Sequence, residues 1–515
     1  MGTDKEKNVS WRHEVLLPAL RGILPRGDLP GAQQATPFNL NRYALLFLYV
    51  LQTFMTGCVY FGWAPLSAML LRAEVFSFKC DVDEKGSFID DQRKFGNNYI
   101  CDKQDASVQS LFVITLATHC TMSALAGAMM DTLGPKITSM IGQCFHIIAW
   151  SLISTLTAES NARVYLGFIF MGLGADTAFL PTLLITRLFP GAAATVITLI
   201  GSASSASFAI PLILNSYLTS NGISGCWWYV GFGPCLFLLV AALSMPLTAY
   251  AVFEEDLPEH GRTAQADQHT LPESPHLSKQ DTGDIIPSAG PRASNEGKDQ
   301  QKPSARTNHT FLKTLFSENY LLVVIYFVAV GWVTSFYQEA HDRILEPTSL
   351  KFLGNALPFS FIPCIILGKL SEVIGILAVM GIVNSAGVLA YSFSLKQTVT
   401  TGIVSVLCFI VYMSLFVSQV FVYVEENFPA KFFGRLIGIV QLVGGLLSLL
   451  CSPLFHLTVG LGPKGMYVVQ LPIIGLLSLM YIVLARMWWI NRRSHVSQKR
   501  ENGPVTTAAS AVPEP

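Results

Sequence analysis

Charged side chains are scarce in this 515-residue chain. They make up 13% of it, about half the share of a typical soluble protein. The 34 lysines and arginines are matched by 34 aspartates and glutamates, so neither sign is in excess. That balance excludes a strongly basic nucleic-acid-binding protein and a disordered polyanion, and we expect no nucleic-acid partner.

Catalytic signatures are also missing. The sequence contains no His-Glu-x-x-His, no Gly-x-Ser-x-Gly, no phosphate loop and no cluster of metal ligands. We therefore predict no catalytic residue, no metal site, no cofactor and no enzymatic activity. A repeated pore or filter segment, which a channel would need, is not found either.

Apolar residues, at 51%, are abundant instead, and the mean hydropathy is +0.45. Runs of about 20 apolar residues cross a bilayer as helices, because lipid cannot hydrogen-bond to an open backbone. We expect an all-α polytopic membrane protein with twelve spans: 43–71, 107–130, 137–157, 162–187, 191–218, 224–252, 319–338, 351–369, 374–395, 399–425, 432–456 and 465–488.

A polar, proline-containing stretch in the middle of the chain divides these spans six and six. Its composition cannot bury a core and is typical of disorder. The expected parts are a cytoplasmic N-tail (1–42), an N-terminal six-helix half (43–252) with an extracellular loop at 72–106, a cytoplasmic linker (253–318), a C-terminal six-helix half (319–488) and a cytoplasmic C-tail (489–515). Lysines and arginines gather in the tails and the linker, which places both termini inside.

Eight of the ten cysteines fall in apolar spans, where they act as small hydrophobes. The other two, Cys80 and Cys101, share the loop expected outside. An oxidising face and a common loop predict a disulfide between them.

The two halves repeat short elements at corresponding places, which predicts pseudo-symmetry between them. Gly127-x-x-x-Asp131-x-x-Gly134 follows the second span, and Gly368-x-x-x-Glu372-x-x-Gly375 follows the eighth. Phe-Pro pairs open the fifth and eleventh spans, and a proline suits a first helical turn. We expect Asp131 to dock on the positive start of the eleventh span and Glu372 on that of the fifth.

These contacts would form a gate on the cytoplasmic side. A salt bridge between Arg187 and the pair Glu425/Glu426, at equivalent ends of the fourth and tenth spans, would be its second element. The candidate gating residues are Gly127, Asp131, Gly134, Lys136, Arg187, Gly368, Glu372, Glu425, Glu426, Lys431 and Arg435.

The Gly127–Lys136 loop resembles the signature of the major facilitator superfamily. Three stretches resemble its solute carrier family 43 branch of large neutral amino acid transporters and the related apicomplexan amino acid transporters. They are Phe61-Gly-Trp-Ala-Pro-Leu66, Phe189-Pro190 with Thr195-Val-Ile-Thr-Leu199, and Phe428-Pro-Ala-Lys-Phe-Phe-Gly-Arg-Leu-Ile-Gly438. The resemblance implies facilitated amino acid transport across a plasma membrane by a fold of two six-helix halves. The chain departs from the superfamily loop in keeping only Lys136 after the second glycine, which weakens a charge-relay form of the gate.

Ionisable or polar side chains deep in a bilayer are costly and are therefore candidates for substrate contact. Asp176, near the middle of the fourth span, could receive an amino group or a cationic side chain. His119 and His146 are weaker candidates, more typical of packing. The remaining candidates are small polar or aromatic residues, and small residues can equally serve helix packing. The full substrate-binding set is Tyr60, Trp63, Asp176, Ser202, Ser204, Ser205, Trp332, Tyr412 and Gln441.

The sequence thus predicts an alternating-access carrier of cationic or large neutral amino acids, embedded in the plasma membrane and acting as a monomer. A nucleobase carrier of the same family is one alternative. A nutrient sensor built on a transporter scaffold is an alternative from another class.

Overall fold

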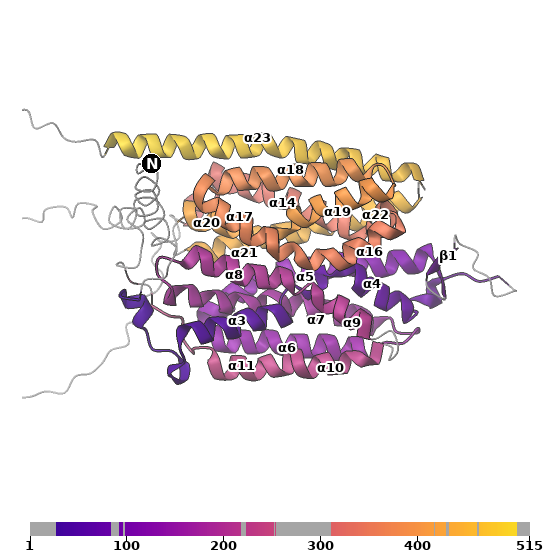
Figure 1. Ribbon diagram of the computed structural model, residues 1–515, viewed down its shortest axis with the longest axis horizontal. Helices are drawn as coiled ribbons and strands as arrows, with labels where there is room; N and C mark the ends of the chain where they lie inside the picture. Colours follow the sequence, from indigo (N-terminus) through magenta and orange to yellow (C-terminus); the bar gives the residue numbers. More distant parts are fainter. Residues whose placement is uncertain are drawn as a thin grey trace, which may run out of the picture.

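The computed structural model describes residues 27–83, 92–95, 98–217, 223–251, 253, 311–416, 418–428, 432–460 and 463–501. Its helices run along the long axis of the molecule in two groups, the N-terminal half and the C-terminal half (Figure 1). A β-hairpin, β1 (Gln92–Phe95) paired antiparallel with β2 (Asn98–Cys101), lies at one end. We call this the hairpin end and the other the tail end.

The N-terminal half contains six spans. Their elements are α3 (Arg42–Thr56), η4 (Val59–Phe61) and α4 (Trp63–Arg72); α5 (Asp102–Leu133); α6 (Pro135–Ser154); α7 (Ala162–Phe179) continued by η6 (Leu180–Leu188); α8 (Ala193–Ala206) and α9 (Ala209–Tyr217); and α10 (Cys226–Val230), η8 (Gly231–Cys235) and α11 (Leu236–Ser244). Short 3-10 turns lie before and between them: η2 (Pro30–Gln33), η3 (Pro37–Asn39), η5 (Ser77–Lys79) and η7 (Ile223–Gly225).

The C-terminal half repeats the plan. Its elements are α14 (Glu318–Glu339); the short α15 (His341–Ile344); α16 (Pro347–Ala356), η10 (Leu357–Ser360) and α17 (Phe361–Ile374); α18 (Ile376–Ser394); α19 (Val399–Ser414) and α20 (Ser418–Asn427); α21 (Phe433–Ser448) and α22 (Cys451–Gly460); and α23 (Pro463–Glu501). The long α23 extends past the other helices at the tail end (Figure 1).

Among the described residues, eleven helical segments are long and apolar enough to cross a membrane. The first expected span is not one of them because it is broken: α3 ends at Thr56 and α4 begins at Trp63, with the turn η4 between them. The broken helix completes the twelve spans. The predicted fold class is confirmed.

Two predicted turn glycines take the same backbone conformation in the two halves. Gly134 and Gly375 both have φ +84°, in the left-handed region that side chains with a Cβ avoid. Each lets one helix end and the next begin within a single residue, α5 to α6 and α17 to α18. The repeat read from the sequence therefore corresponds to a repeated turn.

The two halves meet closely where α5 crosses α21 and where α8 crosses α17. A Cβ built on Gly445 would lie 2.3 Å from the Cβ of Cys120, and one on Gly368 would lie 2.4 Å from a methyl of Thr198. Only glycine permits these approaches, so small residues set the distance between the halves.

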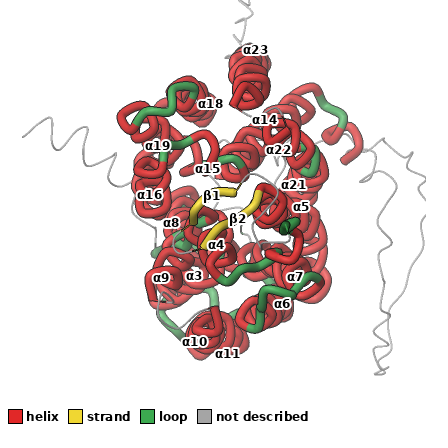
Figure 2. The backbone as a smooth tube through the Cα atoms, turned by 90° about the vertical axis from the view of Figure 1, so that its right-hand side faces the viewer, coloured by secondary structure: helices red, strands yellow, loops and turns green. Residues whose placement is uncertain are grey.

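The predicted disulfide is present: Cys80 and Cys101 are joined, with their Cα atoms 5.9 Å apart. Cys101 ends β2 and also accepts a hydrogen bond from the backbone N–H of Gln104 at the start of α5. Seen from the hairpin end, the two strands lie over the centre of the helix bundle (Figure 2). The disulfide thus fixes the end of the hairpin to the segment directly after η5, next to the first turn of α5.

Candidate functional site

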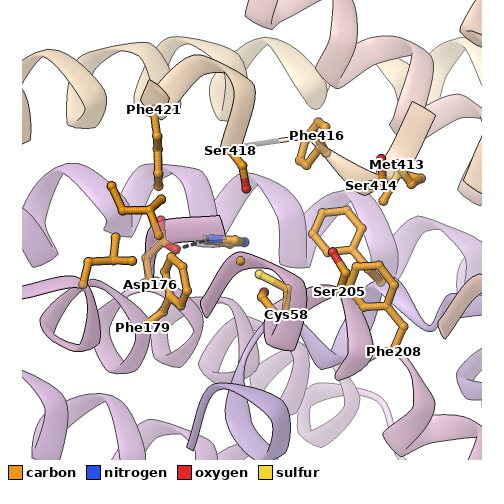
Figure 3. A pocket seen from close by; sticks show the side chains of 16 residues that line it. Cys58, Asp176, Phe179, Ser205, Phe208, Met413, Ser414, Phe416, Ser418 and Phe421 are labelled. Atoms are coloured by element: carbon orange, nitrogen blue, oxygen red, sulfur yellow. Dashed lines mark ion pairs between the residues drawn. The ribbon is translucent and has the colours of Figure 1, made fainter. Parts of the chain in front are cut away.

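A small cavity of about 50 Å³ lies between the two halves, beside the break in the first span. Phe421 and Ser418 point into it from the C-terminal half, opposite Asp176, Phe179 and Cys58 of the N-terminal half (Figure 3). Its polar lining consists of Cys58, His119, Asp176, Ser204, Ser205, Ser414 and Ser418, and its aromatic lining of Phe61, Phe179, Phe208, Phe416 and Phe421.

Asp176 is the centre of a buried polar network and is only 2% exposed. One carboxylate oxygen, Oδ1, lies 2.9 Å from Nε2 of His119 on α5. The other, Oδ2, accepts a hydrogen bond of 3.1 Å from the Gln441 amide on α21. Asp176 therefore joins two helices of its own half and one helix of the other.

The network continues on both sides of Asp176. Nδ1 of His119 lies 2.6 Å from the hydroxyl of Tyr60, and the thiol of Cys120 donates to the Gln441 carbonyl at 3.7 Å. Because an ionised carboxylate only accepts, the imidazole hydrogen belongs on Nε2, and in the neutral tautomer Nδ1 accepts from Tyr60. Tyr60 belongs to η4, so the break in the first span brings its hydroxyl into the site.

Five of the predicted substrate residues are gathered here. Tyr60, Asp176 and Gln441 form the network, and Ser204 and Ser205 line the cavity.

The other four predicted substrate residues make contacts elsewhere. The Trp63 indole donates to Gln109, and that of Trp332 to the carbonyl of Leu447. Ser202 donates to Leu199 of its own helix. The Tyr412 ring packs against Gly387 of α18, where a Cβ would lie 2.7 Å from it. Trp63, Trp332 and Tyr412 thus contact neighbouring helices, and Ser202 bonds within its own helix; none of the four lines the cavity.

The histidines also differ from each other. His119 is part of the site, whereas His146 packs its ring against Gly174, within 3.0 Å of a Cβ built there. The packing role expected of His146 is what the structure shows.

At the tail end, the expected salt bridge between Arg187 and Glu425 or Glu426 is not formed. The guanidinium of Arg187 donates to the carbonyl of Tyr250 at 2.6 Å, within its own half, and interacts electrostatically with Asp131. Glu425 and Glu426 are exposed. In this conformation Arg187 is held within its own half, and the salt bridge stays a prediction.

Two residues of the other expected gate contacts cannot be followed in the described part of the structure. Lys431 lies outside it, and so does the side chain of Glu372. Asp131 is exposed, although α5 does approach the start of α21, where Gly434 lies 3.7 Å from a Cβ built on Gly127. Arg435 lies over the Phe311 ring at 5.8 Å. The backbone N–H of Lys136 donates to Pro246.

The contact that does join the halves at this end uses a neighbour of the predicted residues. Lys369, next to Gly368, donates from Nζ to Oγ1 of Thr195 in the first turn of α8, at 2.8 Å. The end of the eighth span thus reaches the start of the fifth, through Lys369 of α17.

A second cluster, at the hairpin end, was missed. Nη2 of Arg343, on α15, lies 2.7 Å from Asp102 and 3.3 Å from Asp105 at the start of α5. Burial alone would lower the pKa of the Arg343 guanidinium, but Asp105, Asp342 and Asp102 outweigh it and raise the pKa. The arginine thus stays charged and joins the two halves.

This cluster extends toward the cavity. Asp105 accepts a hydrogen bond from the Gln109 amide at 3.1 Å, and Gln109 in turn accepts from Trp63. Nearby, the Gln338 amide donates to the carbonyl of Phe61 at the break in the first span, 3.1 Å away. The sequence offered one signal for this cluster, the acids Asp102 and Asp105 shortly after Cys101. Their partner Arg343 lies 241 and 238 residues further along the chain.

Comparison with known proteins gives consistent matches. Residues 53–453 match the Major Facilitator Superfamily. The chain is 42% identical to Amino acid transporter 6-1 of Toxoplasma gondii, over 90% of this chain and 81% of that protein. It is 34% identical to Arginine transporter 1 of the same organism, over 93% and 94%. Among solved structures, the proton:xylose symporter XylE is similar in fold, with a TM-score of 0.57 at 11% identity, over 87% of this chain and 96% of that one.

Proposed function

The chain belongs to the major facilitator superfamily, and on that premise we propose that it is an alternating-access carrier of amino acids, with cationic amino acids as its preferred substrates. Two full-length relatives named as amino acid and arginine transporters support the substrate class. We place the carrier in a plasma membrane as a monomeric unit with both termini cytoplasmic, so that the hairpin end faces outward.

The observation that carries the preference for cations is the lining of the cavity. Asp176 is the one carboxylate among the described lining residues, and no lysine or arginine is among them. Five phenylalanine rings line the same cavity. A carboxylate with aromatic faces attracts an ammonium or guanidinium group, and burial strengthens both attractions.

In this conformation the halves are joined at both ends, by Arg343 at the hairpin end and Lys369 at the tail end. The cavity between them is smaller than the engineered cavity of about 150 Å³ that accommodates benzene. An amino acid can therefore enter only when one end opens. Opening and closing the two ends in turn, around a fixed site, is alternating access.

In this conformation, the carboxylate of Asp176 contacts His119 and Gln441. An arriving cation takes over the carboxylate, and Gln441 is released from it. Because Gln441 belongs to the other half, substrate binding changes a contact between the halves. This links occupancy of the site to the movement of the halves.

Counterflow of labelled arginine in liposomes tests the proposal. Wild-type protein should exchange external labelled arginine for internal arginine, and Asp176→Asn should lower this exchange at least about tenfold, since it removes a charge that the cation needs. Unlabelled arginine, lysine, leucine, tyrosine and adenine are then compared as competitors.

Large neutral amino acids are the second candidate, because the five phenylalanine rings also suit apolar side chains. Competition by leucine and tyrosine but not by lysine would favour them. Competition by adenine alone would indicate a nucleobase carrier. Binding without any counterflow would indicate a sensor and would refute the carrier.

A further inference from the structure

The carboxylate of Glu339 is buried without a partner. Glu339 is the last residue of α14 and its side chain is 0% exposed. Neither carboxylate oxygen has a hydrogen-bond partner among the residues that the structure describes. Burying a carboxylate with no compensating group is costly in a membrane protein, so such a residue is by default a candidate for ligand contact.

Further unpaired oxygens lie on the same part of α14. In the described structure, Oγ1 of Thr334, Oγ of Ser335 and Oε1 of Gln338 are buried and have no hydrogen-bond partner. Gly331, Ser335 and Glu339 are spaced by four residues and therefore share one ridge of the helix. Gly331 is buried, yet a Cβ built on it would meet no atom within 4 Å. The ridge thus borders free space and carries acceptors that lack donors.

This group is separate from the Asp176 site. Tyr320 and Trp332 of α14 donate to Leu436 and Leu447 of α21, so the two helices run side by side in the same direction. These two hydrogen bonds place Gln441 of α21 level with a point on α14 about 13 residues before Glu339. At a rise of 1.5 Å per residue, Glu339 therefore lies about 20 Å closer to the hairpin end than Gln441. An arginine side chain cannot reach both carboxylates at once.

The nearest charged groups leave Glu339 available. Arg343, one turn further on, is occupied by Asp102 and Asp105, and Asp342 lies beside it on α15. From α22, the group that interacts electrostatically with Glu339 is the thiol of Cys451, which carries no positive charge.

We propose that Glu339, with Ser335 and Gln338, forms an outer subsite that binds the cationic group of the substrate on its path between the hairpin end and Asp176. The inference rests on the proposed transport of cationic amino acids. A guanidinium offers five N–H donors and an ammonium three, which matches a surface of unpaired acceptors. The cation satisfies the carboxylate, and the carboxylate raises the local concentration of cationic substrate at the entrance.

Arginine uptake into proteoliposomes, measured as KM and Vmax, tests the subsite. Glu339→Gln keeps the size of the side chain and removes its charge. We expect it to raise the KM for arginine about tenfold while Vmax stays within about twofold. Ser335→Ala should raise KM by a smaller factor, roughly two- to threefold. The matched control is Glu159→Gln, the same change at an exposed position between the third and fourth spans, which should leave KM unchanged.

Three results would overturn the subsite. One is an unchanged KM in Glu339→Gln. Another is a loss of Vmax at constant KM, which would make Glu339 part of the gate. The third is a changed pH dependence of uptake at constant KM, which would make it a proton site. Should Glu339→Gln not purify as a monodisperse protein, Ser335→Ala decides by the same criteria. Failure of wild-type counterflow would instead refute arginine transport itself.

Discussion

Replacing Arg343 by glutamine should open the hairpin end. The guanidinium joins α15 to the start of α5 through two carboxylates, at 2.7 Å to Asp102 and 3.3 Å to Asp105. Asp105 is fully buried, while Arg343 and Asp102 are 20% and 30% exposed. Breaking a fully buried pair costs about 3–5 kcal/mol.

Solvent reaches two of the three groups, and the glutamine amide can still donate to one carboxylate. Arg343→Gln should therefore destabilise the closed conformation of the hairpin end by a smaller free energy, about 1.5–3 kcal/mol. That corresponds to a roughly ten- to hundredfold shift of the equilibrium toward the open form.

Cys58 reports this opening because it lines the central cavity. A membrane-impermeant maleimide is added to intact cells that express the protein, and the rate at which Cys58 is modified is followed by mass spectrometry. Arg343→Gln should raise that rate roughly ten- to hundredfold, as the equilibrium shift requires. Arg163→Gln, the same change at an exposed position at the start of α7, should leave it unchanged. A rate for Arg343→Gln within about twofold of wild type would refute the role of this cluster as a gate.

Two further predictions concern the framework around the site. Gly445→Ala should abolish most arginine counterflow or prevent folding, because its Cβ would lie 2.3 Å from that of Cys120 where the halves cross. The control is Gly381→Ala, at a position where a Cβ meets nothing within 4 Å. Equal arginine counterflow by the two variants would contradict this account. Replacing Cys80 and Cys101 by serine should lower the free energy of unfolding by about 3 kcal/mol, seen as a lower Tm in detergent; an unchanged Tm would show that the disulfide constrains little.

Much of the fold could be predicted from the sequence because the membrane restricts the choices. Long apolar runs in a membrane have to be helices. The Gly-x-x-x-acid-x-x-Gly motif, found once in each half, marks equivalent turns, as the matching φ angles of Gly134 and Gly375 show. The break in the first span was not predicted, because the residues from Gly57 to Trp63 are as apolar as their neighbours. Gly57 and Gly62, which end α3 and precede α4, were the available signal. A Cβ on Gly62 would lie 2.5 Å from the carbonyl oxygen of Phe208, a tertiary contact that a local pattern does not contain.

The candidate site was partly predictable for the same reason. A lone acid in an apolar run is costly, so Asp176 was a candidate from its residue type alone. Aligning the two Phe-Pro pairs places Gln441 opposite Ser202, which made Gln441 a candidate, but its hydrogen bond to Asp176 was not predicted. Trp63 and Tyr412 had the right residue type but face other helices. Arg343 looked like ordinary loop charge, because its partners on α5 lie more than 200 residues earlier in the chain.

The contacts that Asp176 makes within the protein itself have a consequence for the transport cycle. A buried charge that only substrate could neutralise would prevent the unloaded protein from closing, and each turnover would then require cargo in both directions. Here His119 and Gln441 take the place of the cargo. On the proposed function, we therefore expect the carrier to reset without cargo, so that net arginine uptake down a gradient proceeds into liposomes that hold no countersubstrate.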